Sequence, residues 1–344
     1  MRTKLVVSCA ALAMVATACG GGSSTQSGSG TGDKADAGKK VTIGVSQRRL
    51  AGSDWWATLI QGMKDEAAKQ NAQIIVTDAG GDSVKQNADV QTLLTRGVQA
   101  LIINPHDPTG IAPAVNAAKG AKVPIVVVNS NLSEELASSQ YCYVAEDQSK
   151  VAGGMGEEMA KRVKERFGNK PLKGVVIGGY SGETVTKLRG DGVVAGFAKA
   201  PDAPKIQYLP VRYGEWLPDK ALPQIRDVAT ANPDLNVVFS LSDVMLPGIK
   251  QGLKDAGILD KVVIGSYDGQ MSVVKEMMDN PNGPVQADAS NEPYKMGQVS
   301  VQKAVAAAKG EDREKVCPGG NFYIDTFLAT PETGKKYYEP SRQF

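Results

Sequence analysis

The chain has 344 residues, of which 42% are apolar and 22% charged, and both fractions are ordinary for a soluble globular protein. They exclude a fully disordered chain, a collagen-like chain and a membrane protein with many spans. The formal net charge is only +2, and Arg2 and Lys4 at the start of the chain account for it. The rest of the sequence is neutral, so we expect no nucleic acid partner.

The first 40 residues predict a targeting signal and a tether rather than a fold. The apolar stretch Leu5–Ala16 follows a basic start; it is too short to cross a bilayer and is typical of a signal peptide. Small residues then precede Cys19, as in a bacterial lipobox, where the signal is cut before the Cys and the Cys is acylated. We therefore predict a signal peptide over 1–18 and a lipid anchor at Cys19 on the extracytoplasmic face of the membrane. Ordinary secretion with a chance Cys is the alternative.

The segment 19–40 is rich in Gly and Ser. Residues 20–40 include no aromatic and no branched apolar residue, so this segment has no side chains that could form a hydrophobic core. A flexible tether of this length reaches about 25 Å on average. The folded part is therefore expected to begin near Val41.

From Val41 onward, short apolar runs alternate with helical patterns. The apolar runs are continuous rather than alternating, which is typical of strands buried on both faces. Strands are predicted at 41–46, 73–78, 100–104, 124–129, 140–145, 173–178, 205–211, 237–241, 262–267, 285–289 and 322–328. Helices are predicted at 54–70, 84–96, 109–120, 149–167, 184–199, 218–231, 245–256, 270–279 and 293–309. This alternation predicts an α/β protein with parallel sheets, and the number of units favours two lobes.

Polar residues follow many of these strands, and parallel sheets bind ligands at the carboxyl ends of their strands. Amides, hydroxyls and carboxylates dominate, and such a mixture suits a neutral polyhydroxylated ligand. Each of these residues alone has the alternative role of capping the next helix. The candidates are Gln47, Arg48, Asn104, Asn129, Ser130, Ser242, Asp268 and Asn291.

The three Trp residues also lie where strands meet helices. Trp55 and Trp56 follow Asp54 at the start of the first helix, and Trp216 lies in a loop after a strand. An indole ring offers a flat apolar face to the C–H groups of a sugar. We therefore expect Asp54 and the three tryptophans at a binding cleft; three core tryptophans are the alternative.

Signatures of catalysis and of nucleotide binding are missing. No GxGxxG follows a predicted strand, and no P-loop pattern is present. The only His, His106, lies in a loop after a strand and is expected at a cleft rim or on the surface. We predict no catalytic residue, no metal and no cofactor. Cys142 and Cys317 are the Cys pair of the folded part, and one disulfide is the favoured interpretation, with two separate thiols as the alternative.

Several segments together carry a family resemblance. They are the opening run at 41–46, the aromatic pair 55–56, the segments 93–98 and 100–105, and the segments 237–243 and 265–269. With them, residues 41–330 resemble the sugar-binding type I periplasmic binding proteins. The loop at 214–218 is similar to the Trp-Leu-Pro loop of the xylose-binding protein in that family.

The resemblance implies two Rossmann-like lobes with parallel sheets, joined by a three-strand hinge. The lobes would comprise 41–145 plus 292–322 and 146–291 plus 323–344, with crossovers near 144–147, 291–293 and 321–326. It also implies that the lobes close on a sugar and that the closed form docks on the permease of an ABC transporter.

For the site, the resemblance implies that Trp55 and Trp216 sandwich the sugar. The implied polar contacts are Asn129, Lys187, Ser242, Asp268 and Asn291. The ribose-binding pattern has Asp-Arg at Asn129-Ser130, Arg at Lys187 and Asn at Ser242, so two Arg side chains and one carboxylate of that pattern are lost, which argues against ribose itself. Either Arg48 or Arg49 would supply a replacement cation.

The sequence therefore predicts a monomeric, lipid-anchored binding protein that delivers a small sugar or polyol, with a pentose or pentitol favoured, to an ABC transporter. A sensor that presents its ligand to a membrane receptor and an envelope carbohydrate-active enzyme are the alternatives.

Overall fold

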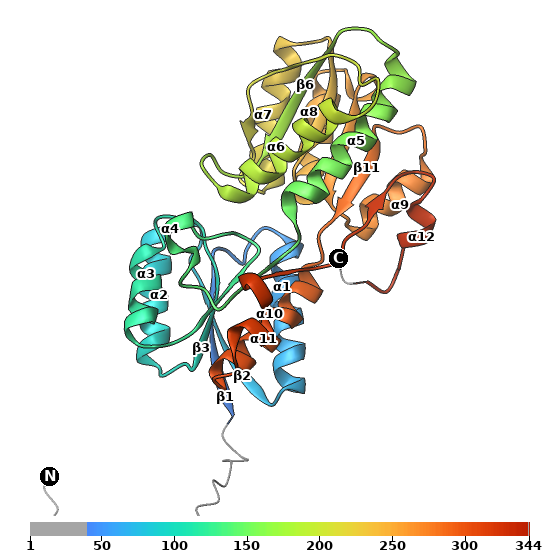
Figure 1. Ribbon diagram of the computed structural model, residues 1–344. Helices are drawn as coiled ribbons and strands as arrows, with labels where there is room; N and C mark the ends of the chain where they lie inside the picture. The colour runs from blue at the N-terminus through green and yellow to red at the C-terminus, as the bar shows by residue number, and fades with distance from the viewer. Residues whose placement is uncertain (1–39, 343) are drawn as a thin grey trace, which may run out of the picture. The chain divides into compact units, whose positions relative to one another are not determined.

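The computed structural model describes residues 40–342 and 344, and Lys40–Phe344 form one compact unit (Figure 1). The predicted signal peptide, the lipidation site Cys19 and the tether up to residue 39 lie outside the described residues. Within residues 40–342 and 344, no helix is both long enough and apolar enough to span a membrane.

The first sheet has six parallel strands in the order β12-β5-β4-β3-β1-β2. Their bounds are β1 Val41–Gln47, β2 Ala72–Asp78, β3 Ala100–Asn104, β4 Ile125–Val128, β5 Cys142–Ala145 and β12 Asn321–Tyr323. The central strands are fully buried runs of branched residues such as Ile-Val-Val-Val in β4, as expected for a sheet covered on both faces.

Helices cover both faces of this sheet, with α2 and α3 on one face and α1 and α10 on the other (Figure 1). Their bounds are α1 Asp54–Lys69, α2 Ser83–Thr95, α3 Ala112–Gly120 and α10 Pro293–Ala308, and two short helices are α4 Glu134–Ala137 and α11 Arg313–Val316.

The second sheet has seven strands in the order β13-β11-β10-β9-β6-β7, with β8 also paired to β6. Their bounds are β6 Leu172–Gly178, β7 Ile206–Tyr208, β8 Arg212–Tyr213, β9 Leu235–Ser240, β10 Val263–Asp268, β11 Val285–Ser290 and β13 Leu328–Ala329. The helices that flank this sheet are α5 Gln148–Phe167, α6 Thr184–Lys199, α7 Pro218–Ala231, α8 Leu246–Asp255 and α9 Met271–Asp279. The helices α5 and α6 pack tightly, because at Gly196 a Cβ would lie 2.0 Å from the carbonyl oxygen of Gly153.

Two predicted strands are each divided in the structure. The run 205–211 gives β7 and then, after a break, β8, because Pro210 has no N–H for the ladder. The run 322–328 supplies β12 to the first sheet and β13 to the second, where β13 is antiparallel to β11. The segment 324–327 passes between the sheets. The chain also passes between them after β5 and after β11, where the hinge was predicted; the exact lobe boundaries stay a prediction.

A disulfide joins Cys142 to Cys317, with the two Cα atoms 5.8 Å apart. It links β5 to the segment just before β12, and these two strands are neighbours in the first sheet. The bridge spans 175 residues of sequence and holds the end of the chain to the first sheet.

The C-terminal residues pack back against the two later crossings between the sheets. Arg342 forms an ion pair with Glu292, with nitrogen and oxygen 2.6 Å apart, and its guanidinium lies 5.1 Å from the ring centroid of Phe327. Phe327 in turn stacks on Tyr337 in the short helix α12 Gly334–Tyr337, and Phe344 is buried.

Candidate functional site

A cavity lies at the carboxyl ends of the strands of both sheets, which is where parallel sheets bind ligands. Residues from both sheets and from the crossover after β11 line it. They are Arg48, Ser53, Trp55, Trp56, Asn129, Glu183, Val185, Arg189, Trp216, Ser242, Asp268 and Asn291.

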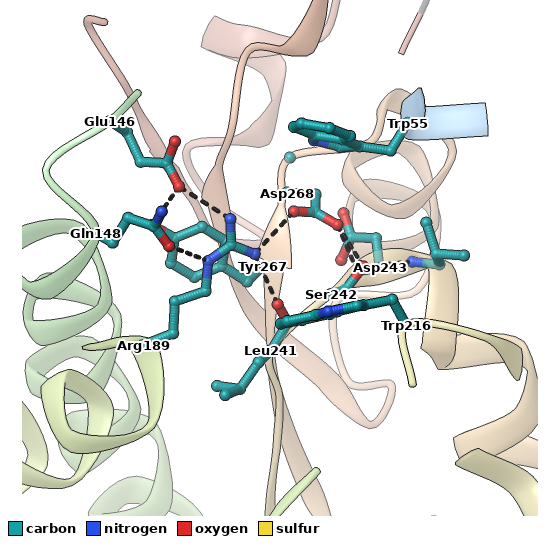
Figure 2. A network of polar contacts seen from close by, with 12 residues as sticks. Trp55, Glu146, Gln148, Arg189, Trp216, Leu241, Ser242, Asp243, Tyr267 and Asp268 are labelled. Atoms are coloured by element: carbon teal, nitrogen blue, oxygen red, sulfur yellow. Dashed lines mark hydrogen bonds and ion pairs between the residues drawn. The ribbon is translucent and has the colours of Figure 1, made fainter. Parts of the chain in front are cut away.

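All three tryptophans of the sequence line this cavity and are largely buried. Trp55 and Trp56 lie in the first turn of α1, where the side chain of Ser53 accepts a hydrogen bond from the N–H of Trp55. Figure 2 shows the rings of Trp55 and Trp216 on opposite sides of Asp268. The two rings therefore form two apolar walls with a carboxylate between them.

The backbone conformation at Trp216 determines where its indole ring lies. Glu215 and Trp216 both have left-handed φ angles, of 51° and 60°, which side chains with a Cβ rarely adopt. The ring lies against the backbone of Gly179, where a Cβ would come within 1.8 Å of it. Its Nε1 donates to Glu183 at 2.8 Å. Gly179 is therefore required for the ring to occupy this position.

Arg189 from α6 is the centre of a buried polar network (Figure 2). It donates to Gln148 at 3.0 Å, to the carbonyl of Leu241 at 2.9 Å, to Asp268 at 3.2 Å and to Glu146 at 2.9 Å. Its guanidinium also lies 3.9 Å from the ring centroid of Tyr267. Burial acts to lower the pKa of Arg189, but Glu146, Tyr267 and Asp268 together outweigh it and the pKa is raised, so Arg189 stays charged.

Asp268 ends β10 with an unusual φ of 133° and is 2% exposed. Its Oδ2 accepts from the hydroxyl of Ser242 at 2.5 Å and from the N–H of Asp243 at 3.2 Å. Burial raises the pKa of Asp268 to about 6, while Arg189 and Ser242 act in the opposite direction. The carboxylate is therefore largely ionised at neutral pH and ready to accept from a hydroxyl group.

Other polar atoms of the cavity have no hydrogen-bond partner within the described part of the chain. They are Nε1 of Trp55, Oδ1 of Asn129 and both amide atoms of Asn291. A buried polar atom without a partner is costly, so these four atoms are suited to the hydroxyl groups of a ligand.

The charges that line the cavity are paired with one another. Arg48 forms an ion pair with Glu183, and Arg189 pairs with Asp268 and Glu146. Both Arg residues of the lining are already paired, so no free cation is left for an anionic ligand, and the lining favours a neutral ligand over an anionic one. Among residues 40–342 and 344, no group of three or more His, Cys, Asp or Glu is placed to hold a metal ion.

The structure brings eight of the predicted site residues to the cavity: Arg48, Trp55, Trp56, Asn129, Trp216, Ser242, Asp268 and Asn291. Gln47, Asn104 and Ser130 are buried next to it: Asn104 donates to Gln47 at 2.7 Å, and Ser130 accepts from Arg48 at 3.0 Å. Of the basic pair, Arg48 points inward and Arg49 donates to the carbonyl of Gly80.

Two predicted site residues do not lie at the cavity. Asp54 is exposed on the first turn of α1. Lys187 is 75% exposed and pairs with Asp191 one turn further along α6. The buried cation of this helix is Arg189, two positions later, and Arg189 rather than Lys187 lines the cavity.

Sequence reasoning missed Ser53, Glu183, Val185 and Arg189. The helical period contained a signal for Arg189, because it lies four residues after Val185 and four before Val193 on the buried face of α6. No comparable pattern marked Glu183, which directly precedes this helix as its N-terminal cap residue.

Comparisons with known proteins agree with this geometry. Residues 43–312 match the family model described as periplasmic binding protein domain. The chain is 29% identical to the ribose import binding protein of Bacillus subtilis over 80% of its own length and 85% of that protein. It is 28% identical to a xylitol-binding protein of Mycolicibacterium smegmatis over 82% of its own length and 76% of that protein.

Among solved structures, the fold is similar to that of an ABC transporter solute binding protein from Mycobacterium smegmatis with bound glycerol. The TM-score is 0.77 and the identity 29%, and the match covers 88% of this chain and 99% of that one.

Proposed function

The chain belongs to the periplasmic binding protein family, and from this premise we propose that it captures a small neutral sugar or polyol and delivers it to the permease of an ABC transporter. Such a protein needs tight, reversible binding and no chemical step. Two flat rings and a set of buried hydrogen-bonding groups provide this kind of binding.

One observation carries the proposal: the cavity has apolar walls at Trp55 and Trp216, unpartnered amide atoms at Asn129 and Asn291, and Arg residues that are already paired. A sugar or polyol presents C–H faces to rings and hydroxyl edges to amides and carboxylates. An anionic or purely apolar ligand would leave part of this lining without a partner.

Within this class we propose a pentose or a pentitol. The loop at 214–218, which is similar to the Trp-Leu-Pro loop of the xylose-binding protein, supports this assignment. A relative named for xylitol binding and a similar structure that holds glycerol point in the same direction.

We also propose that the protein is anchored through Cys19 and that residues 19–40 hold the folded part close to the membrane. The lipobox-like residues before Cys19 and the Gly/Ser-rich composition of the tether support this. Mass spectrometry of the protein from membranes tests it, because an acylated N-terminal Cys19 is expected and an unmodified Cys19 would contradict the anchor.

Thermal unfolding against a panel of pentoses, hexoses and sugar alcohols tests the proposed function. A ligand at 100 times its Kd adds about 2.7 kcal/mol of apparent stability, which raises Tm by several degrees. We expect one pentose or pentitol to produce this shift and Trp55→Ala to abolish it. A shift with a hexose alone would contradict the narrower assignment, and no shift across the panel would contradict capture of a sugar.

A further inference from the structure

Glu183 makes a contact between the part of the chain that carries the second sheet and the part that carries the first. It is the cap residue before α6, whereas its partner Arg48 directly follows β1. Nη1 of Arg48 and Oε1 of Glu183 form an ion pair, and both side chains are 3% exposed. This contact joins the two sheets directly, 135 residues apart in sequence.

The other carboxylate oxygen of Glu183 faces a wall of the cavity. Its Oε2 accepts from Nε1 of Trp216 at 2.8 Å, and also from the N–H of Tyr180 at 3.2 Å and the hydroxyl of Thr186 at 3.1 Å. One oxygen therefore pairs with Arg48 while the other holds the indole ring in place.

Arg48 is held in place by groups around its guanidinium. Nη1 donates to the hydroxyl of Ser130 at 3.0 Å, and Nη2 lies 3.3 Å from Nδ1 of His106. The ring of Tyr180 lies 5.3 Å away, and it packs edge-on against His106. Burial and the charge of Arg48 both lower the pKa of His106, so the ring is neutral and its Nδ1 can accept a hydrogen bond.

We propose that Glu183 is a positioning residue with two separable roles, one for each carboxylate oxygen: it closes the cleft through Arg48 and it fixes the ring of Trp216 for stacking on the ligand. This inference rests on the proposed function for the second role only. The first role involves only groups of the protein itself, because the ion pair contains no ligand atom. We name this pair and its surrounding residues Ser130, His106 and Tyr180 the clasp.

The two roles predict different results for two substitutions at the same position. Glu183→Gln removes the charge that pairs with Arg48, but its amide oxygen still accepts from Nε1 of Trp216. Glu183→Ala removes both contacts. Arg48→Gln breaks the ion pair from the other side and leaves Glu183 free to hold Trp216. A residue with a merely structural role would not separate these outcomes.

The test measures the ligand-free protein by small-angle X-ray scattering and by tryptophan emission. Emission reports on this region alone, because all three tryptophans line the cavity. We expect Arg48→Gln, Glu183→Gln and the double variant to show the same increase in radius of gyration over wild type. We expect Glu183→Gln to keep the wild-type emission maximum and Glu183→Ala to shift it to longer wavelength.

The matched control is Asp191→Asn, which neutralises an exposed carboxylate on the same helix that pairs only with Lys187. It should leave both measurements at their wild-type values. If neither Arg48→Gln nor Glu183→Gln changes the radius of gyration, the closing role is wrong. If Glu183→Ala leaves the emission unchanged, the role in holding Trp216 is wrong.

A second experiment measures the affinity of each variant for xylitol and for D-xylose. Close charge pairs couple strongly, so each single variant should weaken binding by at least about tenfold, and the double variant should be no weaker than the weaker single one. Effects that add in the double variant would mean that both residues contact the ligand independently and would overturn the clasp. If wild type binds neither these probes nor any sugar of the panel, the proposed function fails, while scattering still decides the closing role.

Discussion

Two groups of polar residues at the cavity differ in how they are partnered. In the network of the second sheet, Asp268 accepts from both Arg189 and Ser242, and Arg189 also donates to Glu146, so folding alone provides these contacts. Asn129 after β4 and Asn291 in the crossover after β11 instead have amide atoms without partners among the described residues. The comparison teaches that the network around Arg189 is built by folding, and that the two amides are completed by the ligand.

This difference separates stability from affinity. Substitutions in the network around Arg189 should lower both the free energy of unfolding and the affinity for the ligand, because they break contacts that form on folding. Substitutions of the unpartnered amides should damage affinity alone.

The largest effect is expected for Arg189→Met. It leaves Glu146 and Asp268 buried without their cation, and breaking a buried ion pair in this way costs about 3–5 kcal/mol. Urea unfolding of the ligand-free protein measures it. Arg162→Met is the control, because its partners Glu332 and Glu158 are 63% and 16% exposed and both reach solvent, so the loss should stay near or below about 1 kcal/mol. Equal losses of unfolding free energy in the two variants would mean that the buried network around Arg189 stabilises the protein no more than an exposed ion pair does.

The second prediction concerns pH and the carboxyl group of Asp288, which lies below the turn after Asp268 and accepts from the N–H of Gly269 at 3.1 Å. Burial raises the pKa of Asp288 to about 8 and that of Asp268 to about 6, from a usual value of 3.8. The folded state therefore keeps protons that the unfolded state has released, so the stability from these groups is present at low pH and is lost as the pH rises towards 8.

Asp288→Asn cannot release a proton and should flatten this fall in stability between about pH 5 and pH 8. Unfolding free energies of both proteins across this range provide the measurement. If the variant keeps the full pH dependence of wild type, Asp288 is not its source.

The third prediction concerns Asn291→Ala. The substitution removes two amide atoms that have no partner within the described residues, so unfolding of the ligand-free protein should change little. Affinity for the ligand should fall by about 1–3 kcal/mol, because hydroxyl groups of the ligand lose their partners. Calorimetric titration and urea unfolding together test this, and a large loss of stability would place Asn291 with the second-sheet network instead.

The smallest effect is expected for Lys187→Ala. Lys187 was predicted from the family resemblance as a ligand contact, but it is exposed and pairs with Asp191 outside the cavity. Stability and affinity should both stay within about 0.5 kcal/mol of wild type. A loss of affinity would restore Lys187 to the site.

The fold and most of the site followed from local patterns in the sequence. Buried strands are continuous apolar runs, and the polar residues at their carboxyl ends identified Asn129 at the edge of the first sheet and Ser242 and Asp268 at the edge of the second. Strand ends identify such an edge because the carboxyl ends of the parallel strands in one sheet all lie at the same edge.

What could not be predicted depends on tertiary contacts. Nothing in the sequence around Glu183 indicates that Arg48, 135 residues away, is its partner. Likewise, the choice between Arg48 and Arg49 depends on which of two adjacent side chains points into the cleft, and only the backbone after β1 decides it. Lys187 was predicted as a ligand contact from the resemblance alone. The helical period, which puts Arg189 on the buried face of α6, was not used.

The most direct test of the central claim, capture of a neutral polyhydroxylated ligand, is a pair of calorimetric titrations with one carbon chain in two charge states, xylitol and xylonate. The charges that line the cavity are already paired, so an anionic ligand would be buried without a cation. The account predicts that xylitol binds and that xylonate binds at least about a hundredfold more weakly. Binding of xylonate with equal or greater affinity would contradict it.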